Sequence, residues 1–258
     1  MDGPAVCFAW PRKFDVFGVQ ISATTYDEAL AAVMKAAKAR RSATVTHISS
    51  HGLTTAARDP KFRAVINSFD IAAPDGQPVR WSLKWFHKQL LPDRCYGPEL
   101  MIRLCRAAAK EGVSIYLYGS SPQVLELLSE NLKRECLGLK IAGVESPPFR
   151  ELSADEEQAA IDRINQSGAG LIFIGLGCPR QDVFAAKHKH AIKGVQLAVG
   201  AAFDFHAGNK KMAPRWMQRH GLEWFFRLTQ EPTRLWKRYL AIHTTFALLL
   251  TRRLIFGR

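Results

Sequence analysis

Two acidic residues come shortly after short segments that are predicted to be strands. Asp75 follows the run 69–73, and Asp204 follows the run 195–199. The carboxyl ends of the strands form the ligand-binding edge of an open α/β sheet, so both side chains are expected at that edge. A carboxylate there can act as a general base if burial raises its pKa toward neutrality. The alternative for Asp75 is a simple turn, because Pro-Asp-Gly is an excellent turn sequence.

Three loops rich in small residues also follow predicted strands. One contains Gly119 and Ser120, one contains Gly175 and Gly177, and the third spans 200–208 around Asp204. Small residues let backbone N–H groups approach a ligand closely, and a helix that begins near 180–182 would favour a diphosphate at its N-terminus. One such loop is a weak signal, since ordinary turns between strands and helices look alike. Three on one sheet edge favour a nucleotide-diphosphate pocket.

Histidine and cysteine spacing gives no metal-site pattern. His188 and His190 lie two apart in a predicted helix, 181–190, so they point to different faces and are interpreted as surface residues. His47 and His51 could line the pocket as strand-end residues or could be structural. The five cysteines are scattered and form no Cys-x-x-Cys pair, as is typical of reduced thiols in a cytosolic protein.

The charge is strongly basic, with a formal net charge of +13. This balance predicts an anionic partner: a nucleic acid, an anionic membrane surface or a phosphorylated substrate. Residues 209–258 contribute a local net charge of +9, with tryptophan and phenylalanine between the basic residues. Such a segment suits an interfacial amphipathic helix or a nucleic-acid surface, and its plainer interpretation is a helical subdomain with solvated lysines and arginines.

Alternating strands and helices must position these residues. The expected strands are 14–21 (or a hairpin), 43–48, 69–73, 113–118, 139–144, 171–174 and 195–199. The expected helices are 25–40, 53–66, 79–86, 99–111, 123–136, 154–167 and 181–190, with polar loops at 49–52 and 200–208. This alternation predicts an α/β fold, a Rossmann-like, mostly parallel sheet with helices on both faces.

The chain divides by composition into a disordered leader (1–13), an α/β core (14–208) and a basic, aromatic-rich helical appendage (209–258), hereafter the tail. Two or three helices are expected in the tail, with a break near Pro232. No signal peptide is recognised at the N-terminus. The apolar run 246–250 is too short to span a bilayer.

Several motifs together point to one family. They are Arg58-Asp59-Pro60, Pro74-Asp75-Gly76, Gly175-x-Gly-x-Pro-x-Gln181, Gly200-x-x-Phe-Asp-Phe-x-Ala-Gly208, Ala213-Pro-Arg-Trp-Met-Gln218, Gly221-Leu-Glu-Trp224, Arg227-Leu228 and Glu231-Pro-x-Arg-Leu-Trp-x-Arg-Tyr239. With these motifs the chain resembles the bacterial WecG/TagA/CpsF glycosyltransferase family from about residue 14 to 240.

The resemblance implies a metal-independent, inverting transfer from a UDP-sugar to an undecaprenyl-diphosphate-linked sugar. It implies a cytoplasmic protein, peripheral on the inner face of the cytoplasmic membrane, with no cofactor beyond the donor substrate. Asp75 matches the general base of the family, and Gln181 matches a residue of its active site. Arg234 and Arg238 match basic residues of an appendage that closes over the site and neutralises the leaving UDP.

One departure concerns the donor sugar. The family usually carries Thr-x-Asn where this chain has His47-Ile48-Ser49, so His47 and Ser49 are expected near a bound sugar. The donor is left open between UDP-glucose or another UDP-hexose, as in exopolysaccharide branches, and UDP-N-acetylmannosamine. The leading alternative is a basic nucleic-acid-binding α/β module, although no nucleic-acid partner is expected. A dinucleotide-dependent oxidoreductase is disfavoured because a tight Gly-x-Gly-x-x-Gly is lacking. The oligomeric state, including a homo-oligomer, stays open.

Overall fold

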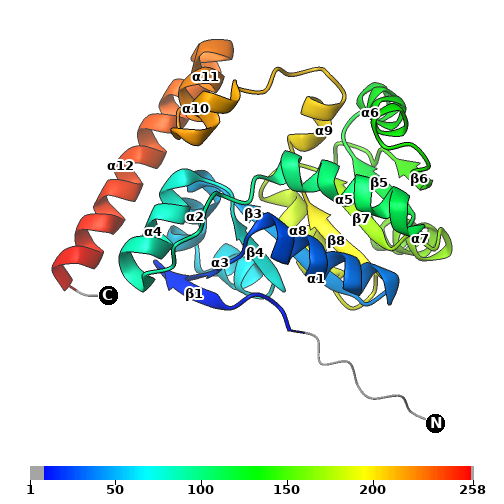
Figure 1. Ribbon diagram of the computed structural model, residues 1–258, viewed down its shortest axis with the longest axis horizontal. Helices are drawn as coiled ribbons and strands as arrows, with labels where there is room; N and C mark the ends of the chain where they lie inside the picture. The colour runs from blue at the N-terminus through cyan, green and yellow to red at the C-terminus, as the bar shows by residue number, and fades with distance from the viewer. Residues whose placement is uncertain (1–8, 257–258) are drawn as a thin grey trace, which may run out of the picture.

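Six parallel strands form the sheet around which the molecule is built (Figure 1). The computed structural model describes residues 9–256. The strand order is β4-β3-β8-β7-β5-β6. Their bounds are β3 Ala43–Ile48, β4 Ile71–Pro74, β5 Ile115–Gly119, β6 Ile141–Glu145, β7 Leu171–Gly175 and β8 Val195–Ala198. A separate antiparallel hairpin consists of β1 Lys13–Val16 and β2 Val19–Ser22. The predicted α/β class with a parallel sheet is confirmed.

Helices connect the strands and cover both faces of the sheet. They are α1 Tyr26–Lys38, α2 Ser50–Arg58, α3 Pro60–Asn67, α4 Gln77–His87, α5 Gly97–Glu111, α6 Pro122–Glu135, α7 Ala154–Gln166, α8 Arg180–Lys187 and α9 Ala202–His206. The described part of the tail contains two short helices, α10 Arg215–Arg219 and α11 Glu223–Gln230, and one long helix, α12 Pro232–Phe256.

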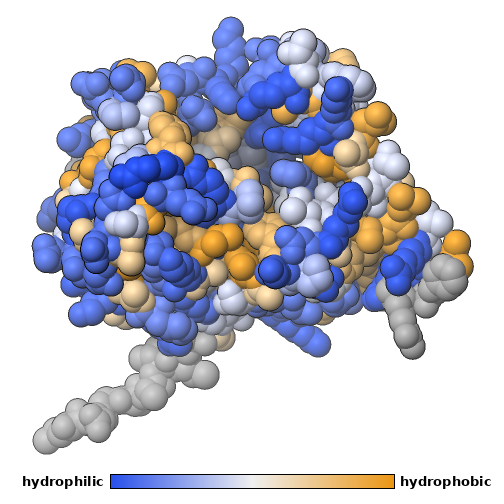
Figure 2. Space-filling view, turned by 180° about the vertical axis from the view of Figure 1, so that it is seen from behind, coloured by the Kyte–Doolittle hydropathy of each residue, from blue (hydrophilic) through white to orange (hydrophobic). Residues whose placement is uncertain are grey.

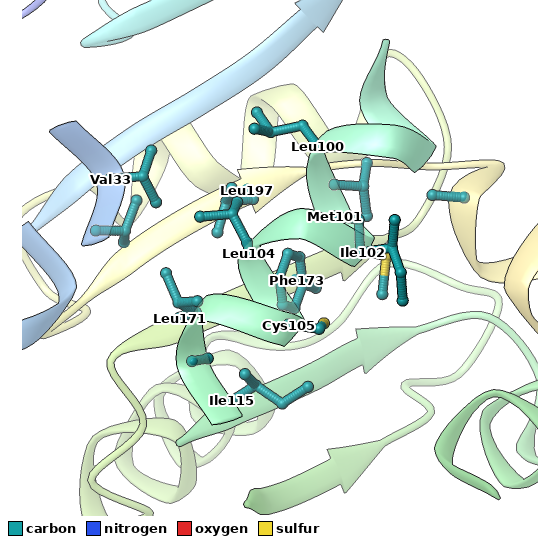
Figure 3. Close-up of a cluster of buried hydrophobic side chains, with 14 of the residues drawn as sticks. Val33, Leu100, Met101, Ile102, Leu104, Cys105, Ile115, Leu171, Phe173 and Leu197 are labelled. Atoms are coloured by element: carbon teal, nitrogen blue, oxygen red, sulfur yellow. The ribbon is translucent and has the colours of Figure 1, made fainter. Parts of the chain in front are cut away.

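The alternation of side chains along β7 shows how the two faces are filled. Leu171 and Phe173 belong to the core beneath α1, α5 and α6, whereas Ile172 and Ile174 belong to the core beneath α7 and α8. Figure 3 shows the first of these cores, in which Leu104 of α5 lies over the strands. Strands buried on both faces read as continuous apolar runs, and this is why the sequence signal for β7 is strong.

Local chemistry explains where the predicted helix boundaries were wrong. The loop predicted at 49–52 is helical, because Ser49 caps α2 by accepting a hydrogen bond from the N–H of Gly52 at 3.4 Å. The single helix predicted over 53–66 is broken at Asp59, whose carboxylate caps α3 ahead of Pro60. Proline at the first position of a helix needs no N–H partner, so it begins α3 rather than interrupting a longer helix.

Two further predictions need correction. Residues 1–8 of the expected leader lie outside the described residues, but Trp10 is partly buried against the core and Arg12 accepts a backbone hydrogen bond from Ala23. Part of the predicted leader is therefore packed. His188 is buried and paired with Glu157 at 2.9 Å, so its prediction as a surface residue was wrong, whereas His190 is exposed.

The topology places the carboxyl ends of β3, β4, β5, β7 and β8 at one edge. From β3 the chain runs outward to β4 in one direction, and from β5 it runs outward to β6 in the other. Ligands of open α/β sheets bind in the crevice beside such a change of direction. The tail helices lie across from this edge, and α12 then runs down one side of the molecule (Figure 1). Of the helices within residues 9–256, none has the length and apolarity required to cross a bilayer.

Candidate active site

The edge at the ends of β3, β4 and β8 holds Asp75, a predicted site residue whose carboxyl pKa is raised. Asp75 directly follows β4, His47 lies near the end of β3, and Gln181 lies in the first turn of α8. Figure 2 shows the surface hollowed between the tail and the α/β core. The structure thus places Gln181 at the same sheet edge as His47 and Asp75, which precede it by more than a hundred positions in the sequence.

Backbone hydrogen bonds hold Asp75 in place at the end of β4. The N–H groups of Asp75 and Gly76 both donate to the carbonyl oxygen of Ile48, at 3.1 and 3.3 Å, which anchors the turn to the end of β3. The side chain is 18% exposed. Burial raises the pKa of Asp75 to about 6, although the nearby guanidinium of Arg94 lowers it in part. A carboxylate with such a pKa is ionised at neutral pH and is still basic enough to accept a proton.

Arg94 links Asp75 to the tail. Its Nη1 lies 3.8 Å from Oδ1 of Asp75 and donates to the Asp75 carbonyl oxygen at 3.3 Å. Its Nη2 lies 2.5 Å from Oε2 of Glu223 at the start of α11. Glu223 also accepts from the hydroxyl of Tyr96 at 3.2 Å and pairs with Arg227 at 2.6 Å. This buried ion cluster ties α11 to the residues next to the candidate base.

The charge on Glu223 is maintained inside the protein. Burial alone would raise its pKa, but Arg227 and Arg94 outweigh that effect and hold the pKa below its ordinary value. Glu223 also raises the pKa of Asp75 by its negative charge. The tail therefore influences the candidate base electrostatically, through Arg94 and Glu223, as well as covering it.

The arginines of the tail occupy different environments. Arg227 is the more enclosed, with its guanidinium 5.2 Å from the ring of Phe205, and its Nε is buried without a hydrogen-bond partner. Arg234 is exposed and paired with Glu231. Arg238 is exposed. Burial is the main cause that lowers the pKa of His51, and the charge of Arg238 lowers it further. Of the two arginines predicted for the site, Arg238 acts electrostatically on His51 and Cys178, whereas Arg234 is paired with Glu231.

His47 presents an unused ring nitrogen. Its Nδ1 lies 3.2 Å from the carbonyl oxygen of Ala198, and since a carbonyl only accepts, Nδ1 carries the proton. Nε2 is then an acceptor, and it is shielded from solvent without a hydrogen-bond partner. Burial lowers the pKa of His47 to about 4, so the ring is neutral at physiological pH. A buried acceptor without a partner is a feature that a ligand hydroxyl could satisfy.

Gln181 shapes the loop after β7. Its Oε1 accepts from the N–H of Gly177 at 3.1 Å, and a side chain at Gly200 would approach the same oxygen to 3.0 Å. Gly177 has a φ of +77°, which glycine adopts without strain. Gly175 serves packing instead, because a Cβ there would lie 2.5 Å from the ring of Phe203. The loop is therefore held rigidly at the sheet edge.

The remaining predicted residues lie around this edge with other partners. The N–H of Ser120 donates to the carbonyl oxygen of Gly175 at 3.1 Å, so it is not free for a phosphate as the sequence suggested. Gly119 packs against the backbone of Gly175, with a Cβ position only 2.7 Å away. Ser49 caps α2. Asp204 is half-buried on α9, in a stretch predicted as a loop.

A second carboxylate with a raised pKa lies at the start of α8. Asp182, which is 2% exposed, accepts a hydrogen bond from the hydroxyl of Thr46 at 2.6 Å. Burial raises its pKa to about 6, as it does for Asp75. This bond joins α8 to β3. No group of three or more candidate metal ligands is found among residues 9–256.

Sequence reasoning missed the ion cluster. Arg94, Tyr96, Glu223 and Arg227 were given no role, although Glu223 and Arg227 lie within family motifs. One signal was present: Glu223 and Glu231 are the only acidic residues in the basic tail, and Glu223 lies four positions before Arg227. An acid with that spacing favours an ion pair on one helix face. The partner Arg94 could not be found, because it lies 129 residues away.

Together these groups can remove a proton from a hydroxyl and stabilise negative charge. Asp75 is a carboxylate that can accept a proton, Arg94 lies beside it, and Arg227 and Arg238 are guanidinium groups of the tail. Charge-assisted hydrogen bonds from arginine are well suited to diphosphates.

The comparisons with known proteins agree with this chemistry. The sequence model described as "Glycosyl transferase WecG/TagA/CpsF family" matches residues 14–258. Among curated proteins, the chain is 32% identical over 188 residues to an N-acetylglucosaminyldiphosphoundecaprenol N-acetyl-beta-D-mannosaminyltransferase of Bacillus spizizenii. The match covers 72% of this chain and 70% of that relative.

Proposed function

The chain belongs to the WecG/TagA/CpsF family of glycosyltransferases, and from this premise we propose that Asp75 is its general base. The single observation that best supports the proposal is the position of Asp75, at the strand edge, with a pKa raised by burial to about 6 and a guanidinium beside it. The donor is a UDP-sugar, and the acceptor is a saccharide linked to undecaprenyl diphosphate.

In the proposed reaction Asp75 accepts the proton of the acceptor hydroxyl. The oxygen attacks the anomeric carbon of the donor from the face opposite UDP, a new glycosidic bond forms, and the bond to UDP breaks with inversion. The proton remains on Asp75 until it is lost to solvent, and the leaving electron pair goes to the diphosphate. General-base assistance of this kind contributes about 10²–10⁴-fold in rate.

The charge on the leaving UDP is met by the protein. We propose that Arg227 and Arg238 approach a diphosphate between the tail and the sheet edge, and that local movement on binding lets His47 Nε2, which is buried without a partner, accept from a sugar hydroxyl. We propose that transfer is metal-independent because these cations substitute for a divalent ion in stabilising developing charge. Gln181 positions the loop around Gly177.

The donor sugar is proposed as one of two classes. N-acetylmannosamine is the group that the Bacillus relative transfers, according to its name. UDP-glucose or another UDP-hexose is the alternative, and with it a role in exopolysaccharide rather than other envelope polysaccharides. We propose that the protein is peripheral on the cytoplasmic face of the membrane, held there by its basic tail, with no nucleic-acid partner.

The test is a donor screen with purified full-length protein. UDP release is measured with UDP-N-acetylmannosamine, UDP-glucose and other UDP-hexoses, each with and without a soluble short-chain lipid-diphosphate-linked saccharide. One donor is expected to give acceptor-dependent UDP release that survives EDTA. Absence of acceptor-dependent release with every donor would contradict the glycosyltransferase proposal. Loss in EDTA with recovery in magnesium would contradict metal independence alone.

A further inference from the structure

An exposed aromatic pair lies on α4, outside the tail. Trp81 and Trp85 are one helical turn apart, are 39% and 52% exposed, and have ring centroids 6.1 Å apart. Leu90, just beyond the end of α4, is 76% exposed. We call these three residues the α4 ridge. Indole rings are costly to leave in water, and neighbouring exposed ones mark interaction surfaces.

The charge around the α4 ridge has one sign. Residues 77–92 contain Arg80, Lys84 and Lys88 and no aspartate or glutamate. Arg80 is used internally, donating to the carbonyl oxygen of Leu91, while Lys84 and Lys88 are exposed. The whole of α12 also lacks an acidic residue. A helix face turned to water ordinarily mixes both signs, so these two helices share an unusual, wholly basic character.

Helix α4 contacts the tail at both of its ends. At the start of α4, Gln77 donates to the carbonyl oxygen of Arg219 in the tail at 3.3 Å, and Trp81 lies beside Gly221. At its end, the guanidinium of Arg253 on α12 lies 5.5 Å from the ring of Phe86. Both helices therefore run from the site toward the same end of the molecule, as Figure 1 shows.

Apolar side chains continue along the outside of α12. Figure 2 shows orange and blue groups interleaved along the edge where this helix ends. The exposed large apolar residues of α12 are Trp236, Leu240, Leu248, Leu254 and Ile255. Basic and apolar groups alternating on one helix are typical of a helix lying in the headgroup layer of a bilayer.

We propose that the α4 ridge docks into the headgroup layer of an anionic lipid bilayer, as a second contact beside α12. The membrane contact itself does not depend on the proposed function; only the reason for it, bringing the base close to a lipid-linked substrate, rests on that function. Since α4 begins two residues after Asp75 and rises 1.5 Å per residue, Trp81 lies about 9 Å and Trp85 about 15 Å along the chain from the base. The contact would therefore hold the base near the level of lipid phosphates, where a lipid-linked diphosphate lies.

Charge favours a bilayer over a second copy of the chain. Two copies meeting through this face would bring Lys84, Lys88 and the arginines of α12 against one another with no acidic residue on either helix to pair with them. An anionic leaflet supplies the opposite charge, worth on the order of one kcal/mol per basic residue. Tryptophan is enriched at membrane interfaces, and lysine stems reach along apolar surface to the headgroups.

The test compares two double variants of the full chain. Trp81→Gln/Trp85→Gln removes the α4 ridge aromatics, and Leu137→Gln/Phe149→Gln removes two exposed apolar residues at the α6–β6–α7 end, which are 84% and 79% exposed. Co-sedimentation is measured with vesicles of equal parts phosphatidylglycerol and phosphatidylcholine. The α4 variant should bind these vesicles about tenfold to a hundredfold more weakly than wild type, because two partly exposed indoles lose their burial. The control variant should bind as wild type does.

Two further measurements separate the explanations. UDP release with the soluble acceptor should be unchanged in the α4 variant, while release with a vesicle-embedded long-chain acceptor should fall. Unchanged vesicle binding by the α4 variant, with native circular dichroism, would overturn the inference. So would a self-association in analytical ultracentrifugation that only the α4 variant abolishes. If wild type binds vesicles through α4 but releases no UDP with any acceptor, the proposed function fails and the membrane contact stands.

Discussion

Two carboxylates at the carboxyl-end edge of the sheet both have a pKa raised by burial, but their surroundings differ. Burial raises the pKa of both Asp75 and Asp182 to about 6. Asp182 is 2% exposed and accepts from the Thr46 hydroxyl at 2.6 Å. Asp75 is 18% exposed and lies 3.8 Å from the guanidinium of Arg94, beneath the tail. Asp182 joins α8 to β3, whereas the side chain of Asp75 keeps part of its surface exposed.

The comparison teaches that a raised pKa does not by itself identify a base. Desolvation shifts any buried carboxyl group, whether it is structural or catalytic. Asp75 differs in two respects: its side chain is partly exposed, and neighbouring charges act on its pKa. Arg94 lowers that pKa and Glu223 raises it. Asp182 has no comparable cation among the causes of its shift.

The largest expected effect is a difference in turnover between variants of the two carboxylates. Asp75→Asn should lower turnover by about 10²–10⁴-fold, because the amide cannot accept the acceptor proton. Asp182→Asn retains an acceptor for Thr46 and should lower turnover by less than about tenfold. Initial rates of UDP release at saturating donor and acceptor check both. Equal losses in the two variants would remove the distinction between the two carboxylates.

A smaller effect is expected from the tail. Glu223→Gln keeps the hydrogen-bonding shape but removes a charge that raises the pKa of Asp75, so the pKa of Asp75 should fall. A weaker base and a looser tail should lower turnover at pH 8 by about tenfold. Glu231→Gln removes one partner of an exposed ion pair with Arg234 and is the matched control. It should leave turnover nearly unchanged. Wild-type rates in Glu223→Gln, together with an unmoved pH profile, would show that the ion cluster does not act on the base.

Replacing either carboxylate should change the free energy of unfolding in the same direction. Asp75 and Asp182 have ordinary pKa values of 3.8 and folded values of about 6, so each makes the folded state less stable as pH rises through that interval. At pH 8, Asp75→Asn and Asp182→Asn should each raise the free energy of unfolding by about 1–3 kcal/mol, and below pH 3.8 the gain should vanish. Urea unfolding at pH 8 and pH 3.5 checks this. A loss of stability in both variants at pH 8 would be the contrary result.

Most of the sheet could be predicted from sequence, and for a clear physical reason. Strand β7 is buried on both faces, so it reads as an unbroken apolar run, and β3 is recognised instead by its alternating β-branched residues. Helix ends were harder, because they depend on single caps. Ser49 begins α2 in a stretch that composition marks as a loop, and Asp59 divides two helices that periodicity joins.

The site could be predicted only where each residue carries its own local signal. Asp75 and Gln181 stand beside recognisable strand ends and turns. Arg94 does not, because its importance comes from contacts with Asp75 and Glu223 that form only on folding. Spacing could place Arg234 and Arg238 on one helix face, but it could not show that Arg234 is already paired with Glu231.

The most direct measurement of the central claim is the pH dependence of kcat/KM for UDP release, because it reports the ionisation of essential groups in the free enzyme. With the soluble acceptor, wild type should rise tenfold per pH unit below about pH 6 and level off above it, as Asp75 loses its proton. Asp75→Asn should show a low, flat rate across the same range, whereas Asp182→Asn should keep the wild-type rise. A wild-type profile without a rise near pH 6, or the same rise retained in Asp75→Asn, would contradict Asp75 as the general base.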